Sequence, residues 1–405
     1  MSGSGWEPAS PGVEPGEPVD VILLEASYGG GHAQAAVALA ASLAELEPGW
    51  RVERVDFFDL INPALNEATR YAYAQCLIHA PVLWRELYER TNHLQPESPW
   101  QQFVNRAAAR RLWRFLERRR PRVVVATHPT PAGVAGQLRA DGRLGVPVFA
   151  VVTDYVVHSL WAHPHVDGYL VGAEAVREGL AARGVDPSRV AVTGIPIHPR
   201  FSKTLDRWQV RRAWGLGPEP VVLFMGGSTG MVRGMVEAAS ALARAQGVFQ
   251  LIIVAGRDPV LEGRLRAAVA AGARPVHVLG FVDRVDELMT AADLLVSKAG
   301  GLTISEALAK GLPMLVYRPI PGQEEGNAAF LVAHGAARVT WEPDELVAQV
   351  QALLQRPAER QRMAQAASRL GHPDAGLKAA SRLLDAGRSL TWAGAVARGD
   401  GGGLR

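Results

Sequence analysis

Short apolar runs rich in β-branched residues recur along this chain, and segments with a helical pattern separate them. Runs of this length that alternate with helices are typical of parallel strands buried on both faces. The sequence therefore predicts an α/β fold with doubly wound parallel sheets. The expected strands are Val19–Glu25, Val123–Thr127, Val146–Thr153, Gly168–Val171, Val221–Met225, Gln250–Ala255, His277–Leu279, Leu294–Ser297 and Leu312–Tyr317.

The arrangement of strand, glycine-rich turn and helix start occurs after Val21–Glu25 and again after Val221–Met225. This loose duplication predicts two Rossmann-like domains, and a chain of 405 residues is long enough for both. We expect a disordered tail over residues 1–18, which are mostly Pro, Gly, Ser and Glu. The expected divisions are an N-terminal domain over 19–203, a C-terminal domain over 204–387 and a second tail over 388–405.

The sequence contains no run of roughly 18 apolar residues of the kind that spans a membrane. The N-terminus also lacks the basic start and apolar core of a secretory signal. Cys76 is the only cysteine, which excludes an internal disulfide and fits a reducing compartment. We therefore expect a cytoplasmic protein whose contact with the inner face of the cell membrane is peripheral.

Glycine-rich turns at Gly29–His32, Gly226–Gly230 and Lys298–Gly301 each follow an expected strand. Such turns let backbone N–H groups approach an anion at a helix start. The first two lack the third small residue of a dinucleotide fingerprint, because Gln34 and Met231 stand there, and neither has the Gly-Lys-Ser/Thr of a P-loop. Binding of NAD and hydrolysis of ATP lose support, and binding of a nucleotide diphosphate gains it.

Glu306 lies one turn into the helix after the third turn, within reach of a ribose bound beside the helix start. In the alternative interpretation, Gly300 and Gly301 only make a tight turn and Glu306 is solvated. His32 also starts a helix, whose dipole lowers the pKa of an imidazole and leaves the neutral form that a general base needs. The alternative for His32 is a capping or core histidine.

Polar and aromatic residues are densest at Asp154, His158, Trp161, His163 and His165. The histidine spacing permits a zinc site, whereas the other interpretation is the wall of an acceptor site. His128 ends the strand Val123–Thr127, so it either faces the same cleft or is a turn residue before a proline.

Arginines recur every four residues between Trp100 and Arg122 and predict one basic stripe on a helix. We expect this stripe, together with the aromatic-rich segment Tyr71–Tyr88, to meet anionic lipid headgroups. The alternative is a solvated face of a packed helix. No nucleic-acid-binding motif accompanies the stripe, so a nucleic-acid partner is not expected. The membrane-binding residues are Arg106, Arg110, Arg114 and Arg118.

Two segments, Ser27–His32 and Val152–Pro164, resemble the N-terminal domain of the monogalactosyldiacylglycerol synthases and processive diacylglycerol glucosyltransferases. Lys298–Ala307 and Pro321–Asn327 are similar to the donor-side motifs of the same family. A more distant resemblance is to the enzyme that adds N-acetylglucosamine to the undecaprenyl-linked peptidoglycan precursor. The motifs cover nearly the whole folded chain.

The resemblance implies a GT-B fold, in which two Rossmann-like domains face a cleft. It also implies transfer of a hexose, glucose or galactose, from a UDP-sugar in the second domain to diacylglycerol in the first, with inversion and without a metal or other cofactor. Two alternatives stay open: an undecaprenyl-linked acceptor, and a non-catalytic protein that senses a nucleotide sugar and binds a partner.

The resemblance and the turns together give the candidate site. The catalytic residues are His32, as the base, and Asp154, which orients a reacting group. The expected donor-binding residues are Gly227, Ser228, Phe281, Lys298, Gly300, Gly301, Thr303, Glu306, Gln323, Glu324 and Asn327. The expected acceptor-binding residues are Gly30, Gly31, His128, His158 and Trp161.

Overall fold

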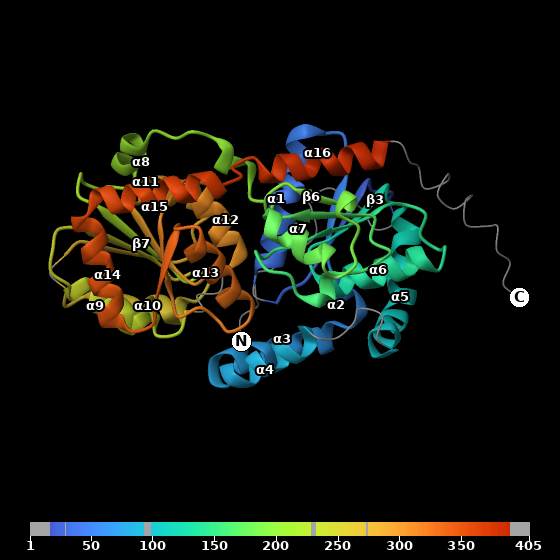
Figure 1. Cartoon of the computed structure of the whole chain (residues 1–405), viewed down its shortest axis with the longest axis horizontal. Coiled ribbons are helices and arrows are strands. Elements are labelled where there is room, and N and C mark those ends of the chain that lie inside the picture. Colours follow the sequence, from blue (N-terminus) through green and yellow to red (C-terminus); the bar gives the residue numbers. More distant parts are fainter. Residues whose placement is uncertain (1–16, 29, 93–98, 228–231, 273, 389–405) are drawn as a thin grey trace, which may run out of the picture.

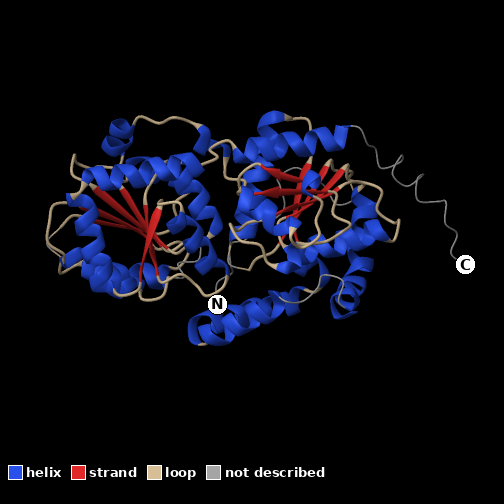
Figure 2. Ribbon diagram, viewed as in Figure 1, coloured by secondary structure: helices blue, strands red, loops and turns tan. Residues whose placement is uncertain are grey.

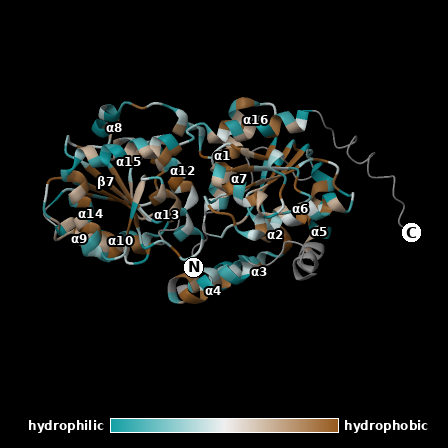
Figure 3. Cartoon of the chain, viewed as in Figure 1, coloured by the Kyte–Doolittle hydropathy of each residue, from teal (hydrophilic) through white to brown (hydrophobic). Residues whose placement is uncertain are grey.

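The computed structural model describes residues 17–28, 30–92, 99–227, 232–272 and 274–388, and within these ranges the side chains of 78, 81 and 99–107 are not described. Two six-stranded parallel sheets lie side by side, each with helices on both faces (Figures 1 and 2). The prediction of an α/β fold with two doubly wound domains is confirmed. Apolar residues concentrate on the strands between the helix layers (Figure 3).

The first sheet has the strand order β2-β1-β3-β4-β5-β6. Its strands are β1 (Val21–Glu25), β2 (Val52–Asp56), β3 (Val123–Ala126), β4 (Val148–Val151), β5 (Gly168–Val171) and β6 (Val190–Val192). Its helices are α1 (Gly31–Leu46), α2 (Phe57–Ile61), α3 (Pro63–His79), α4 (Pro81–Asn92), α5 (Pro99–Arg119), α6 (Pro129–Ala140) and α7 (Glu174–Ala181).

The second sheet has the order β12-β11-β10-β7-β8-β9. Its strands are β7 (Val221–Met225), β8 (Gln250–Val254), β9 (Val276–Leu279), β10 (Leu294–Ser297), β11 (Met314–Tyr317) and β12 (Ala337–Thr340). The helices that follow the first lobe in the chain are α8 (Arg207–Ala213), α9 (Met235–Arg244), α10 (Pro259–Val269), α11 (Val285–Ala291), α12 (Gly301–Ala309), α13 (Gln323–Ala333), α14 (Pro343–Gln355), α15 (Pro357–Leu370) and α16 (Ala375–Arg388).

Three strands, β2, β6 and β12, are absent from the sequence prediction. Each is the outer strand of its sheet and has a single neighbour. Their residues are partly exposed, whereas β1, β7 and β10 are buried along their whole length. A search for continuous apolar runs favours strands covered on both faces, so of the outer strands it finds only β9.

The last helix, α16, returns to the first lobe and packs against α1 and the first sheet (Figure 1). Leu383 and Ala380 lie in the same apolar cluster as Val21 and Leu39. Where α16 passes α1 and the loop after β6, a side chain at Gly376 would collide with Ser42 and the carbonyl of Ile197. The packing of α16 therefore differs from the expected division, which places residues 204–387 in the second domain.

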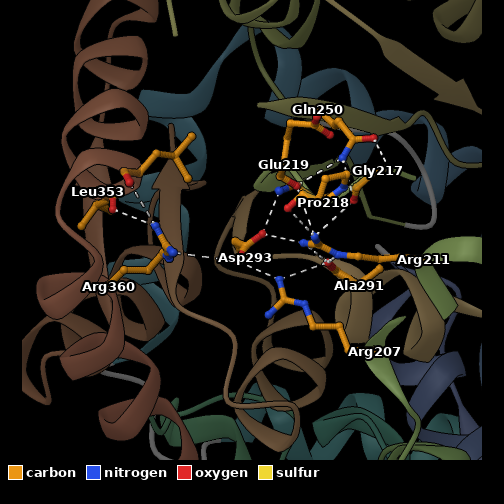
Figure 4. Close-up of polar contacts among 12 residues, drawn as sticks. Arg207, Arg211, Gly217, Pro218, Glu219, Gln250, Ala291, Asp293, Leu353 and Arg360 are labelled. Carbon is orange, nitrogen blue, oxygen red and sulfur yellow. Dashed lines mark hydrogen bonds and ion pairs between the residues drawn. The ribbon is translucent and has the colours of Figure 1, made fainter. Parts of the chain in front are cut away.

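A charged cluster at the amino edge of the second sheet joins that sheet to its helices (Figure 4). The Asp293 carboxylate accepts hydrogen bonds from Arg211 Nη2 at 2.7 Å and from the Val221 amide at 2.8 Å, and Arg207 Nη2 lies 2.7 Å from its other oxygen. Arg211 also donates to the carbonyl of Ala291, the last residue of α11. The Arg211 side chain is 3% exposed, so these contacts are its substitute for water.

We expect Asp293→Ala to lower the free energy of unfolding by about 3–5 kcal/mol, because it leaves the buried Arg211 cation without its carboxylate. Chemical denaturation followed by circular dichroism measures this loss. Glu262→Ala is the matched control, since Glu262 pairs with Arg266 at an exposed site on α10, and its cost should stay below about 1 kcal/mol. Equal, small effects of both changes would contradict a structural role for the Asp293 cluster.

Candidate active site in the cleft between the lobes

Two cavities meet in the cleft at the carboxyl ends of the two sheets, where open parallel sheets bind their ligands. The larger has a volume of about 440 Å³ and the smaller about 230 Å³. Both are lined by residues of the turn before α1 and of the turn before α12. The shared lining residues are Gly31, Lys298, Gly300, Gly301 and Leu302.

His32 lies in the first turn of α1 and lines the larger cavity. Its Nδ1 is 2.5 Å from the carbonyl oxygen of Thr127 and 3.1 Å from Thr153 Oγ1. A carbonyl only accepts, so Nδ1 carries the hydrogen and Nε2 keeps a lone pair. Burial lowers the His32 pKa to about 4, so the ring is neutral at pH 7. This tautomer and charge are those of a general base.

His128 packs edge-to-face on His32, with the ring centroids 4.8 Å apart. It caps α6, and its Nδ1 accepts the backbone N–H of Thr130 at 3.2 Å, which fixes its hydrogen on Nε2. Burial, followed by repulsion from His32 when that ring is protonated, holds the pKa of His128 well below 6.5. The two neutral rings thus differ in role, because His32 offers an acceptor nitrogen and His128 a donor.

Asp154 follows β4 and lines the larger cavity. Its Oδ1 accepts a hydrogen bond of 2.8 Å from Asn327 Nδ2 on the opposite lobe. Burial raises the Asp154 pKa to about 6 and Glu324 adds to the rise, while Asn327 and Lys298 oppose it. The carboxylate is therefore mostly ionised at pH 7.

Lys298 lies where the cavities meet, and its Nζ is 2.6 Å from Glu324 Oε1. Both side chains are nearly buried, with 12% and 5% exposed. Glu324 also accepts the backbone N–H of Ile320 at 3.0 Å. The ammonium is thus held in place at the junction, where it faces both cavities.

The smaller cavity brings together most of the residues expected to bind the donor. Burial, followed by the charge of Asp286, raises the pKa of Glu306 to about 8. Arg200 and Asp283 line the same cavity and pair at 2.8 Å, and the sequence analysis missed both because they lie outside any motif. The expected donor-binding residues found here are Gly227, Phe281, Lys298, Gly300, Gly301, Thr303 and Glu306.

The other donor-side expectations are placed differently. Gln323 and Glu324 line the larger cavity. Asn327 is in the lining of neither cavity, is completely buried, and directs its amide to Asp154 and Tyr155. Ser228 lies outside the described residues.

The larger cavity contains the expected acceptor-side residues Gly31, His128, His158 and Trp161, whereas Gly30 lines the smaller one. His158 caps the short helix Ser159–Trp161, and its Nε2 lies 3.2 Å from the carbonyl of Tyr88. The sequence analysis missed an aromatic wall from α2, α3, α4 and the loop after β1, although it marked part of that region as aromatic-rich. The wall residues are Tyr28, Phe58, Tyr73, Trp84 and Tyr88.

In the part of the chain that the structure describes, no group of three His, Cys, Asp or Glu side chains is arranged to hold a metal. His163 is buried, with its Nε2 3.3 Å from the carbonyl of Pro129, and His165 is exposed. No helix among the described residues is long and apolar enough to cross a membrane. Arg110, Arg114 and Arg118 are exposed on α5, and the side chain of Arg106 lies outside the described residues.

Two family models match the chain, one on each lobe. Residues 32–197 match monogalactosyldiacylglycerol (MGDG) synthase, and residues 221–378 match the glycosyltransferase family 28 C-terminal domain. A processive diacylglycerol beta-glucosyltransferase of Bacillus subtilis (strain 168) is 32% identical over 82% of this chain and 86% of its own length. An enzyme of the same name from Bacillus licheniformis is 31% identical over 83% and 86%.

Solved structures support the fold. MurG of Acinetobacter baumannii has a TM-score of 0.59 at 16% identity, covering 91% of this chain and 100% of its own. A Staphylococcus aureus MnaA–UDP structure has a TM-score of 0.59 at 13% identity, covering 88% and 94%. The two facing lobes have the GT-B fold, and the chain belongs to the family of monogalactosyldiacylglycerol synthases and processive diacylglycerol β-glucosyltransferases.

Proposed function

We propose that this protein is an inverting glycosyltransferase that moves a hexose, glucose or galactose, from a UDP-sugar to diacylglycerol. The observation that carries the proposal is the place of His32. Its neutral ring, with the lone pair on Nε2, lines the larger cavity next to Gly31, which borders both cavities. The names of the Bacillus relatives support diacylglycerol as the acceptor.

In this proposal UDP occupies the smaller cavity. Gly300 and Gly301 place the N-terminus of α12 beside the diphosphate, where backbone N–H groups and the helix dipole favour negative charge. Lys298 adds a fixed positive charge at the junction. Glu306 holds the ribose. Together these groups stabilise the charge that develops on UDP as it leaves.

The acceptor enters the larger cavity, whose aromatic wall suits acyl chains. His32 Nε2 takes the proton of the glycerol hydroxyl, whose oxygen attacks the anomeric carbon while the bond from that carbon to UDP breaks. UDP leaves with the electron pair of that bond. A single in-line displacement of this kind inverts the anomeric centre. The Asp154 carboxylate, beside the same cavity, orients the reacting groups.

The same wall continues into a surface that suits a bilayer. On α3 and α4, Tyr71, Val82 and Leu83 are 68%, 77% and 63% exposed, and Leu87 both lines the larger cavity and is 49% exposed. Figure 1 places α3, α4 and α5 along the same edge of the first lobe. We infer that this edge docks peripherally on the cytoplasmic face of an anionic membrane.

His32→Ala should lower turnover at least about a hundredfold, the lower range for loss of a general base, because no other group replaces Nε2. Affinity for UDP should stay unchanged, since His32 is outside the lining of the smaller cavity. Transfer from radiolabelled UDP-sugar to diacylglycerol in vesicles measures the effect. His165→Ala, at an exposed histidine, is the control and should keep full activity. Near-normal turnover of the His32 variant would remove it from the role of base.

Glu306→Ala should weaken UDP binding by about two- to tenfold, because a hydrogen bond between neutral groups is worth roughly 0.5–1.5 kcal/mol. Burial keeps the Glu306 pKa at about 8, so the carboxyl is mostly protonated at pH 7. Glu306→Gln should therefore retain more affinity than the alanine variant. Titration calorimetry with UDP measures both, and unchanged affinity in a folded alanine variant would contradict this donor site.

Replacing Arg106, Arg110, Arg114 and Arg118 with Gln should weaken binding to anionic vesicles by several kcal/mol at most, from about 1 kcal/mol per arginine. The loss should be largest at low salt, because screening weakens exposed charges. Val82→Ser with Leu83→Ser should instead weaken binding to neutral and anionic vesicles alike, at any salt. Vesicle co-sedimentation measures both variants. Unchanged binding in both would place the docking surface elsewhere.

A further inference from the structure

The loop after β4 belongs to the first lobe but contacts the helices of the second, and we name residues 153–156 the interlobe segment. The backbone N–H of Tyr155 donates to Asn327 Oδ1 at 2.7 Å, and Asn327 Nδ2 donates to Asp154 Oδ1 at 2.8 Å. The Tyr155 hydroxyl lies 2.9 Å from Ser305 Oγ on α12. Its ring stacks on Phe330 of α13 with the centroids 4.8 Å apart. The segment is therefore bound by two helices of the donor lobe.

Glycine provides the space for this contact. A β-carbon at Gly301 would overlap the carbonyl oxygen of Thr153, and one at Gly326 would lie 2.7 Å from Val156 Cγ1. Neither glycine has a positive φ. Space, rather than backbone conformation, therefore requires glycine at both positions. These two residues lie on different helices, yet both accommodate the same four-residue segment.

Both hydrogens and the oxygen of the Asn327 side-chain amide form hydrogen bonds within the protein. Its Nδ2 donates to Asp154 and to the carbonyl of Ala299 at 3.0 Å, and its Oδ1 accepts from Tyr155. The side chain is 0% exposed and outside the lining of either cavity. An amide has two hydrogens and one oxygen, so all of its polar groups are used within the protein. Donating to a sugar oxygen would require breaking one of the two Nδ2 bonds, and Oδ1 is buried with the rest of the side chain.

The other side of the interlobe segment contacts the candidate base. Thr153 Oγ1 is 3.1 Å from His32 Nδ1, the nitrogen whose hydrogen fixes the tautomer. Asp154 lines the larger cavity. Four consecutive residues thus touch both the donor-lobe helices and the proton-transfer site.

We propose that Asn327 is a positioning residue rather than a donor ligand. Seated on Gly301 and Gly326, the interlobe segment couples the arrangement of the donor lobe to the orientation of His32 and Asp154. The kinetic part of this inference rests on the proposed transferase function. The packing of the interlobe segment on Gly301 and Gly326 is a structural inference, and it can be tested separately from the kinetic one.

Asn327→Ala and Gly326→Ala should each lower kcat by about ten- to a hundredfold, the scale expected when reacting groups are misplaced by about 1 Å. UDP affinity should change less than about threefold, because neither residue lines the donor cavity. Gly263→Ala is the matched control, since Gly263 lies in α10 with open space around its β-carbon position. That variant should keep the parent kcat.

Val156→Ala, combined with Gly326→Ala, should restore most of the lost kcat, because it removes the atoms that the new methyl group meets. Val156→Ala alone completes the double-mutant cycle. Hydrogen exchange provides a readout independent of the acceptor. The Tyr155 amide should exchange faster in Asn327→Ala and Gly326→Ala, and at the parent rate in the double variant.

Three results would overturn the proposal. If Asn327→Ala weakens UDP-sugar binding as much as it lowers kcat, Asn327 is a donor ligand. If Gly326→Ala has normal kcat and normal exchange of the Tyr155 amide, close packing of Val156 on Gly326 is unnecessary. If Val156→Ala does not restore the kcat of Gly326→Ala, the loss of activity comes from a local change in α13. If the parent enzyme transfers no sugar to diacylglycerol, the proposed function is contradicted instead. Exchange of the Tyr155 amide would still show whether the interlobe segment depends on Asn327 and Gly326.

Discussion

The backbone of one lobe rests directly on the backbone of the other, where the carbonyl of Thr153 occupies the space in which residue 301 would otherwise carry a side chain. Two parallel sheets can approach this closely at their carboxyl ends only where a glycine omits its β-carbon. The remaining geometry of the cleft follows from this approach. It brings the turn before α12 against the turn before α1, so that one set of residues borders both cavities.

Burial in the cleft also organises its charges. The pKa of His32 falls to about 4, that of Asp154 rises to about 6, and that of Glu306 rises to about 8, and burial is the largest cause of each shift. At pH 7 the three groups are a neutral base, an ionised carboxylate and a mostly protonated carboxyl. One physical effect thus yields three different chemical functions, because each side chain starts from a different ordinary pKa and has different neighbours.

The sequence predicts well whatever depends on local pattern. Strands covered on both faces, such as β7 and β10, appear as continuous apolar runs, and the turn before α12 is recognisable from Lys298 to Gly301. It predicts poorly what depends on partners distant in the chain. The motif around Asn327 gives no sign of its hydrogen bonds to Tyr155 and Asp154, which lie more than 170 positions away. The steric role of Gly301 was equally hidden, because the residue that needs the space is Thr153.

The return of α16 to the first lobe has a consequence for how the molecule is made. Leu383 and Leu384 complete a cluster that contains Val21 and Leu23 of β1. The helix α1 covers part of this side of the first sheet, and its cover is complete only after the ribosome has synthesised α16. The lobes are consequently joined by two covalent crossings, one before α8 and one before α16.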